Sequence, residues 1–240
     1  MNRTLNKIIK REKFNPTLLG LFINHNYNIR RLLHKSLKNN STLLSGKILD
    51  FGCGSKPYER LFINATEYIG VDYKIDGRTE NLDKIDFFYD GKKIPFDDSS
   101  FDSILCTEVL EHVFNIDELL LEFKRVLKPG GKALITTPFM WEEHEMPYDF
   151  ARYTTPALSH LYNKHGFEVL EKNKSGNTIH VIFQFCLSYL KNIFPQNKII
   201  RQILLIPFTF VFNLFGVIFG FILPNDQTSY FNNIFVLEKK

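Results

Sequence analysis

Four largely apolar segments in the middle of the chain constrain its fold more than any other feature of the sequence. Each ends at turn-forming residues, and they cover residues 47–51, 68–72, 101–107 and 131–137. Short apolar runs of this kind are typical of strands buried on both faces of a parallel sheet. Weaker strand signals occur at residues 86–89, 167–171 and 233–238.

Helical spacing is found between the third and fourth of these segments. Apolar residues recur every three or four positions from Ile116 to Leu127, with acidic residues at the start and Lys128, proline and glycines at the end. This arrangement of charges and breakers favours a helix. Strands that alternate with helices predict a doubly wound α/β sheet with its ligand site at the carboxyl ends of the strands.

Charge divides the chain into two parts. Residues 1–47 contain ten Lys or Arg and one acidic residue, a net charge of +9, whereas the other 193 residues hold 20 basic and 25 acidic residues, a net charge of −5. We therefore expect a basic N-terminal helical arm over residues 1–46. Such an arm suits a membrane or a nucleic acid, and a solvated helix face explains it equally well.

Cysteine usage and the N-terminus indicate a reducing compartment. The three cysteines are widely spaced and form no CxxC pair, so neither a disulfide framework nor a thiolate zinc site is expected. The first 20 residues lack the unbroken apolar stretch of a secretory signal. We expect a cytoplasmic protein.

An unusual segment separates the last two candidate strands. Residues 172–225 contain no acidic side chain, and residues 203–223 carry no charge. By length this stretch could span a bilayer, but Pro207 interrupts it and a single span would separate residues 233–238 from their sheet. We expect an apolar, basic insertion at 172–225 that lies on the membrane surface in the plane or as a hairpin. Helices packed on the sheet edge, or a subunit contact, are the alternative.

The turn after the first strand carries a ligand-binding pattern. Asp50 ends the strand, and Gly52 and Gly54 allow a ligand to approach the backbone. Pro57 stands where a nicotinamide-binding fingerprint has its third glycine, which disfavours a nicotinamide oxidoreductase, and it is expected to open a helix. A carboxylate here repels a pyrophosphate, so the turn favours a positively charged ligand.

Acidic residues also end the next two strands. Asp72 ends the second, where a carboxylate can accept both hydrogen bonds of a ribose diol. Asp90 precedes Gly91 at the end of the third, where it could accept from an adenine amine. Any one such acid is more often a turn residue or a helix cap, but their joint occurrence at successive strand ends is specific.

With these acids, and with the runs IPFDDSSFD at 94–102 and VLEH at 109–112, the sequence resembles the class I S-adenosylmethionine-dependent methyltransferases. The small-molecule branch, of the methyltransferase type 11-like kind, is the most similar. The resemblance covers residues 47–171 and resumes at 233–240. It implies a seven-stranded Rossmann-like sheet, a methyltransferase domain at 47–171 and 226–240, and S-adenosylmethionine as the cofactor.

The resemblance also implies roles for individual residues. Asp50, Gly52 and Gly54 hold the methionine part of the cofactor, Asp72 holds the ribose, and the neighbouring Tyr73 is also cofactor-binding. Asp90 and Gly91 lie at the adenine, and Thr107 lies near the transferred methyl group. The third loop glycine of the family is Lys56 here, so either the loop is tighter or this lysine faces the substrate.

The segment after the fifth strand, residues 138–153, supplies the candidates for acceptor chemistry. We predict His144, Asp149 and Tyr153 as catalytic residues and Trp141 and Arg152 as substrate-binding residues, because imidazole, carboxylate and guanidinium groups move protons and bind anions. A similar H-x-x-P-x-D-x-x-R-Y run resembles methyltransferases of surface-polysaccharide and lipid modification. In the alternative interpretation His144 is only exposed, and Asp149 and Arg152 pair on a helix surface.

No metal site is expected. His112, His144 and Asp149 have neither HxH nor HExxH spacing, and His112 more simply braces the loop after the fourth strand.

The predicted function is methyl transfer, as O-methylation, to a small or lipid-linked acceptor by a peripheral or monotopic protein at the cytoplasmic face of the inner membrane. One alternative is a non-catalytic membrane-associated module that keeps the fold. A nucleic-acid methyltransferase is the other, disfavoured because Thr107-Glu108-Val109-Leu110 replaces the Asn/Asp-Pro-Pro-aromatic run of amino-methylating enzymes.

Overall fold

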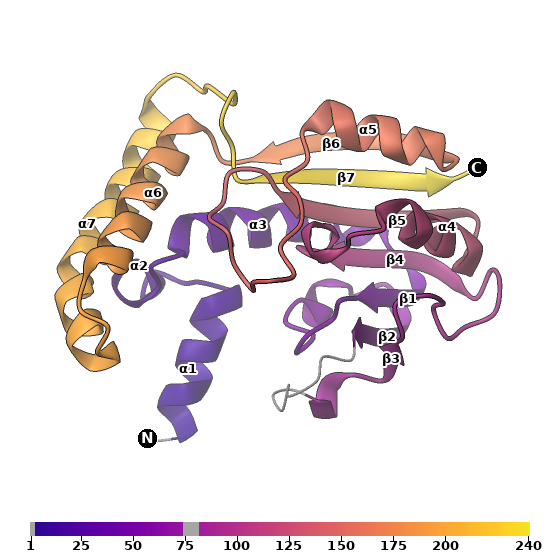
Figure 1. Cartoon of the computed structure of the whole chain (residues 1–240), viewed down its shortest axis with the longest axis horizontal. Coiled ribbons are helices and arrows are strands. Elements are labelled where there is room, and N and C mark those ends of the chain that lie inside the picture. Colours follow the sequence, from indigo (N-terminus) through magenta and orange to yellow (C-terminus); the bar gives the residue numbers. More distant parts are fainter. Residues whose placement is uncertain (1–2, 74–81) are drawn as a thin grey trace. The chain divides into compact units, whose positions relative to one another are not determined.

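The computed structural model describes residues 3–73 and 82–240, and the chain divides into two compact units (Figure 1). The sheet unit consists of Leu37–Asn173 and Asn232–Lys240, and the helical unit consists of Met1–Ser36 and Lys174–Phe231. Residues 1–2 of the predicted arm and 74–81 of the predicted methyltransferase domain lie outside the described residues.

A seven-stranded sheet confirms the predicted Rossmann-like fold. Its strands are β1 (Gly46–Phe51), β2 (Ala65–Tyr73), β3 (Phe87–Tyr89), β4 (Phe101–Thr107), β5 (Leu127–Pro138), β6 (Phe167–Ser175) and β7 (Asn232–Lys239). Their spatial order is β3-β2-β1-β4-β5-β7-β6. The pairs β1–β2, β1–β4, β2–β3 and β4–β5 are parallel, whereas β5 and β7 are antiparallel. The carboxyl ends of β1, β2, β4 and β5 therefore share one edge of the sheet.

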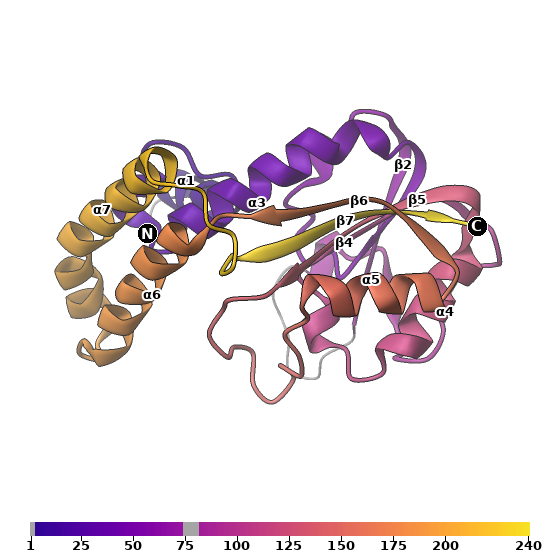
Figure 2. The same cartoon turned by 90° about the horizontal axis from the view of Figure 1, so that it is seen from above.

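Two helices cover one face of this sheet (Figure 2). Helix α4 (Ile116–Val126) has acidic residues in its first turn and basic residues in its last, as predicted. Its apolar stripe is buried in the core and comprises Ile116, Leu119, Leu120, Phe123 and Val126. Helix α5 (Thr155–Lys164) adds Tyr162, whose ring lies 5.1 Å from that of Phe235 in β7.

The prediction that Pro57 opens a helix is wrong. Residues 52–64, between β1 and β2, form turns and the single 3₁₀ helix η2 (Glu59–Leu61). A connection this short, part of which is the glycine turn, leaves too few residues for a crossover helix. Tyr58 and Phe62 fill the space with buried rings instead.

The helical unit combines segments that are far apart in the sequence. It contains α1 (Arg3–Phe14), α2 (Gly20–Ile23), most of α3 (Tyr27–Asn40), α6 (Thr178–Ile193) and α7 (Lys198–Ile222). Buried amides join them, because Asn213 donates to the carbonyls of Leu21 and Asn24 at 3.2 and 3.0 Å, and Gln184 donates to that of His25 at 2.9 Å. The arm and the insertion thus pack together within this unit, while their predicted boundaries stay predictions.

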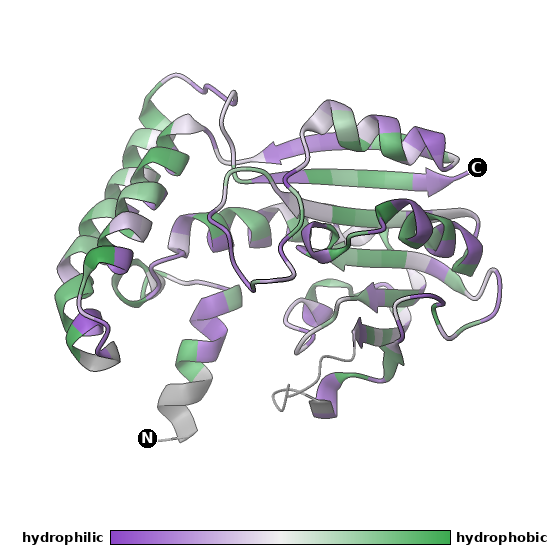
Figure 3. Ribbon diagram, viewed as in Figure 1, coloured by the Kyte–Doolittle hydropathy of each residue, from purple (hydrophilic) through white to green (hydrophobic). Residues whose placement is uncertain are grey.

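Most of helix α7 is strongly apolar (Figure 3). Among the described helices, only its segment Ile200–Ile222 is long and apolar enough to cross a membrane, and 22% of the most apolar window is buried. One such helix is weak evidence for a membrane span. The prediction that Pro207 interrupts this run is wrong, because α7 continues through it. Packing of α7 against α6 and α2 offsets the cost of an interior proline, about 3 kcal/mol.

Candidate cofactor and acceptor site

The turn at Asp50–Gly54, which we call the cofactor turn, requires glycine at two positions. Gly52 and Gly54 have φ of +73° and +51°, in the left-handed region that disfavours a side chain. A Cβ on Gly52 would lie 2.2 Å from Val109, so this glycine permits close packing after β4. A Cβ on Gly54 would meet nothing within 4 Å, so the backbone here is open to a ligand.

Asp50 is buried at the end of β1. The hydroxyl of Tyr68 donates to its Oδ2 at 2.8 Å. Burial raises the pKa of Asp50 to about 7, and the Tyr68 hydrogen bond and the charge of Lys56 oppose this rise. The environment is therefore one in which a cationic ligand would favour the ionised carboxylate. Tyr68 was missed by the sequence reasoning, because only the pairing of β1 with β2 brings it to Asp50.

Asp72 joins the cofactor turn to the end of β2. Its Oδ2 accepts a hydrogen bond from the backbone N–H of Gly54 at 2.9 Å, and its Oδ1 accepts from that of Tyr73 at 2.8 Å. A carboxylate oxygen has more than one acceptor site, so these bonds leave capacity for a diol. The predicted ribose-binding residue thus lies against the predicted methionine-binding turn.

The ends of β2 and β3 lie close together at the predicted adenine position. A Cβ on Gly91 would lie 3.2 Å from Tyr73, whose exposed ring stands 6.3 Å from that of Tyr89. Asp90 Oδ1 accepts from the backbone N–H groups of Lys92 and Lys93 at 2.8 and 2.9 Å, and these bonds lower the pKa of Asp90. Asp90 therefore caps its own turn, and its contact with adenine stays a prediction.

Lys56 replaces a family glycine and has a positive φ of 52°. Its ammonium pairs with Asp86, whose carboxylate also accepts from the backbone N–H of Gly70 at 2.7 Å. Of the two expectations for Lys56, the structure therefore favours the tighter loop, in which this side chain ties the cofactor turn to the start of β3.

Thr107 ends β4 opposite Thr136 of β5, and Glu108 follows it with a φ of +55°. The Glu108 carboxylate accepts from the Thr136 hydroxyl at 2.7 Å and from the Asn232 amide at 2.5 Å. Glu108 was missed by the sequence reasoning, because its partners lie on β5 and β7. It fixes the backbone beside the predicted position of the methyl group.

Residues 138–153, which we call the acceptor loop, are organised around one buried carboxylate. Arg152 binds Asp149 through two hydrogen bonds of 2.6 and 2.7 Å, and Asp149 Oδ2 accepts from the backbone N–H of His144 at 2.9 Å. The Arg152 hydrogen bonds lower the pKa of Asp149 to about 2. Asp149 is therefore ionised and orients its neighbours, and the guanidinium of Arg152, the predicted substrate-binding residue, is hydrogen-bonded to it.

Two imidazoles and a second buried carboxylate adjoin this network. The rings of His112 and His144 are 4.9 Å apart and nearly perpendicular. Glu111 Oε1 lies 3.7 Å from His112 Nε2, and the Glu111 side chain is 1% exposed. Burial raises the pKa of Glu111 well above its usual range, and Glu108 raises it further. Glu111 stands inside the VLEH run but was assigned no role from the sequence.

The other two predicted residues are Tyr153 and Trp141. Tyr153 packs against the hydrophobic core, and burial raises its pKa. Trp141 is half-buried in the acceptor loop. Their predicted roles, catalytic for Tyr153 and substrate-binding for Trp141, stay predictions.

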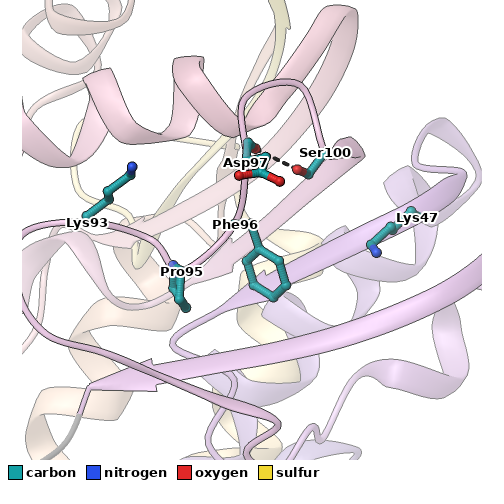
Figure 4. A pocket seen from close by; sticks show the side chains of 6 residues that line it. All are labelled: Lys47, Lys93, Pro95, Phe96, Asp97 and Ser100. Carbon is teal, nitrogen blue, oxygen red and sulfur yellow. Dashed lines mark hydrogen bonds between the residues drawn. The ribbon is translucent and has the colours of Figure 1, made fainter.

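A separate surface hollow of about 420 Å³ lies away from these residues (Figure 4). Lys47, near the start of β1, and Phe96, before β4, are among the residues that line it. The Ser100 hydroxyl donates to the carbonyl of Asp97 at 2.5 Å within it. The hollow is therefore at the amino ends of the strands and is distinct from the candidate site.

The sheet order and the cofactor turn define a class I S-adenosylmethionine-dependent methyltransferase. The chain belongs to the family described as "Methyltransferase domain", whose model matches residues 23–172. S-adenosylmethionine is the cofactor of this class, and the residues present fit it. Gly54 leaves open space, Asp50 suits a cation, and Asp72 retains acceptor capacity for the ribose.

Curated relatives share part of this chain. The mitochondrial 2-methoxy-6-polyprenyl-1,4-benzoquinol methylase of Bos taurus is 35% identical over 81 residues, which are 34% of this chain and 21% of that protein. The ubiquinone/menaquinone biosynthesis C-methyltransferase UbiE of Burkholderia mallei is 30% identical over 117 residues, 43% of this chain and 48% of that protein. The chain thus spans between about a fifth and a half of the length of these relatives.

Solved structures share the fold. Phosphoethanolamine N-methyltransferase 2 of Haemonchus contortus, in complex with S-adenosyl-L-methionine, superposes with a TM-score of 0.57 at 18% identity, covering 95% of this chain and 58% of that one. The [4+2]-cyclase SpnF superposes with a TM-score of 0.55 at 20% identity, covering 86% and 80%. At such identities the similarity concerns the fold alone, which carries more than one chemistry.

Proposed function

We propose that this protein transfers the methyl group of S-adenosylmethionine to a small or lipid-linked acceptor. The observation that carries the proposal is that the cofactor turn and a set of acid and imidazole side chains lie at the same edge of the sheet. The cofactor turn follows β1, and Glu111, His112 and His144 follow β4 and β5. An acceptor between them would have a proton-accepting group on the side away from the cofactor.

The chain's own contribution is alignment and proton removal. When bound, S-adenosylmethionine supplies a methyl group that is already activated, so the protein has to hold an acceptor atom in line with it. An alcohol must also lose its proton, and an imidazole whose Nδ1 is hydrogen-bonded can take it at Nε2. We assign this role to His144, oriented by Asp149.

Names of the relatives support an acceptor with an apolar tail. One relative is a polyprenyl-benzoquinol methylase, and another is a C-methyltransferase of quinone biosynthesis. Because the second relative is a C-methyltransferase, the methylated atom of the acceptor is either a carbon or, as predicted from the sequence, an oxygen. Purified protein should therefore be incubated with methyl-labelled S-adenosylmethionine and fractionated lipids, glycans and metabolites. Hydriodic acid releases the label of an O-methyl product as methyl iodide and leaves a C-methyl product intact.

We further propose a location at the cytoplasmic face of a membrane, with the helical unit as the contact. Apolar side chains exposed on α7 include Ile203, Leu204, Ile206, Phe208, Val211, Phe215, Ile218 and Phe221. Basic residues of the arm and the insertion suit anionic lipids, each contributing about 1 kcal/mol near the surface.

Flotation with anionic vesicles tests this location. Binding should weaken as salt is raised but persist, because salt screens the charges and not the apolar burial. Protein that does not float at low salt would contradict the membrane proposal and favour a subunit contact for this apolar surface.

Two alternatives make different predictions. A non-catalytic module would bind S-adenosylmethionine saturably and label none of the fractions. A nucleic-acid methyltransferase would label RNA or DNA in the same extract. Transfer of the label to a lipid, glycan or metabolite fraction supports the proposed function against both.

A further inference from the structure

Three side chains, two from the segment after β4 and one from the acceptor loop, lie close together near Asp149. Glu111 and His112 lie in the 3₁₀ helix η4 (Leu110–His112) after β4, and His144 lies in the acceptor loop after β5. One ligand-type atom from each, a carboxylate oxygen or an imidazole nitrogen, lies within 4.8 Å of the other two. The two loops meet only in the folded chain, which is why no short sequence spacing reveals the group.

The hydrogen bonds of both imidazoles leave the same nitrogen available. His112 Nδ1 lies 2.7 Å from the carbonyl of Tyr148, which can only accept, so Nδ1 carries the proton. Around His144 Nδ1 are the acceptors Glu142 O and Asp149 Oδ2, both at 3.3 Å. Arg152 Nη2 is also near, at 3.4 Å, but its two hydrogens are donated to Asp149 and to the carbonyl of Glu142. Nε2 of each ring therefore has its lone pair free of a proton.

Glu111 supplies the third donor. Its side chain is 1% exposed, and neither carboxylate oxygen has a hydrogen-bond partner. A buried polar group without a partner is costly, and an anionic one is more costly still. His112 Nε2 lies 3.7 Å from Glu111 Oε1, and in this tautomer it also carries a lone pair. The Glu111 carboxylate and His112 Nε2 thus both direct lone pairs into the same space, and a cation between them would stabilise both.

We propose that Glu111, His112 and His144 bind one divalent transition-metal ion. Two imidazole nitrogens and one carboxylate oxygen suit ions such as Zn²⁺, Co²⁺ or Mn²⁺ better than Mg²⁺ or Ca²⁺, which prefer oxygen. Ligand atoms about 2.0–2.2 Å from an ion lie about 3–4 Å apart, so the 3.7 Å pair already fits and His144 has to move slightly inward. Three protein ligands leave coordination positions open.

The surrounding contacts are those that such a site needs. A metal-binding histidine usually donates its other N–H to a carbonyl or carboxylate, which holds the ring and its tautomer. Tyr148 O does this for His112, and the carbonyl of Glu142 does so for His144, with Asp149 Oδ2 equally near its Nδ1. The bidentate pair with Arg152 keeps Asp149 in place. This inference departs from the sequence expectation of no metal site, which considered only short spacings along the chain.

The metal site changes one step of the proposed function, the removal of the acceptor proton that was assigned to His144, and it rests on that function only for this chemical use. An acceptor hydroxyl bound at an open position would lose its proton to water more readily, as a metal-bound water does. With the ion present, His144 Nε2 would be a ligand, and the hydroxyl proton would pass to solvent instead of to the imidazole. The binding of the ion itself is independent of the acceptor.

Metal analysis of the whole 240-residue chain tests the inference. The protein is stripped with chelator, loaded with Zn²⁺, Co²⁺ or Mn²⁺, and examined by elemental analysis, by calorimetry and, for Co²⁺, by visible absorption. We expect one equivalent of ion per chain. Glu111→Gln and His144→Ala should each weaken binding by at least about 10²-fold, and Asp149→Asn by about 10-fold. His160→Ala, which removes an exposed histidine of α5, is the matched control.

The metal-binding results either support or overturn the proposed site. Stoichiometric binding that is lost in Glu111→Gln and His144→Ala but kept in His160→Ala supports the site. No binding above that of the double variant Glu111→Gln/His144→Ala overturns it, as does binding of Mg²⁺ alone. Calorimetric binding of S-adenosylmethionine, measured on every variant, shows that the sheet unit is folded. It also separates failure of the metal site from failure of the methyltransferase assignment.

Discussion

The cofactor turn and the acceptor loop lie at the same edge of the sheet but are held in different ways. In the cofactor turn, backbone N–H groups meet carboxylates, as Gly54 meets Asp72. In the acceptor loop, side chains also bind one another, since the Arg152 guanidinium donates two hydrogen bonds to Asp149 and the His144 ring lies 3.3 Å from the same carboxylate. The first arrangement needs glycines and acids at particular positions in a motif, whereas the second depends on every member of a network. Substitutions in the two regions should therefore affect different measured quantities.

Replacing His144 with Ala should have the largest effect. If His144 removes the acceptor proton or helps bind the ion that promotes its loss, turnover should fall by about 10² to 10⁴ while cofactor affinity stays unchanged. Initial rates and calorimetry on the same preparation measure both, with His160→Ala as the control. An unchanged rate, with chemistry shown to be limiting, would contradict the role of His144 and point to Asp149 or Tyr153.

The pH dependence of stability should single out Asp50. Its pKa is raised to about 7 in the folded protein, so between about pH 4 and 7 the folded state binds more protons than the unfolded state. The contribution to the free energy of unfolding is therefore present at low pH and is lost as pH rises through 7, by up to about 4 kcal/mol.

Urea unfolding of the cofactor-free protein at pH 5 and pH 8 measures this loss. Asp50→Asn should show a smaller decrease over the same range, because its amide does not ionise. Equal decreases in the parent and the variant would mean that Asp50 is ionised at both pH values. The Asp50 carboxylate would then be negatively charged even when no cofactor is bound.

Replacing Asp72 with Ala should weaken cofactor binding and leave the acceptor loop intact. Each charge-assisted hydrogen bond to the ribose is worth about 1.5 to 3 kcal/mol, so affinity should fall by about tenfold or more. Calorimetry with S-adenosylmethionine measures the change, and Asp97→Ala, an exposed acid beside the surface hollow, is the control. Full affinity in Asp72→Ala would remove Asp72 from the cofactor site.

Tyr68→Phe should have the smallest effect. The substitution removes the hydroxyl that donates to Asp50 and leaves the ring in place, so stability should fall by about 1 kcal/mol at pH 8. The effect should shrink at pH 5, where Asp50 is protonated. A pH-independent loss would show that the ring packing and not the hydrogen bond is what the variant disturbs.

Much of the candidate cofactor site could be predicted from the sequence, because its residues are contiguous in the cofactor turn or end successive strands. Apolar runs predict the strands that carry Asp50 and Asp72, and the structure brings these residues together with Gly54 at one edge of the sheet, while their contacts with the cofactor stay predictions. The acceptor half was only partly predictable. Residue type alone predicts His144 and Asp149, but burial without a hydrogen-bond partner leaves no trace in the sequence, so Glu111 is identified only by the structure.

The sequence by itself determined the class of fold and the kind of cofactor, since apolar period, glycine turns and strand-end acids are local properties. Only the tertiary structure decided which side chains meet across the chain. Pairing of β4 with β5 brings Glu111 and His112 to His144, and the helical unit packs residues of α2 against α7, almost 200 positions further along. Such meetings depend on long-range packing, which a one-dimensional pattern of polarity does not encode.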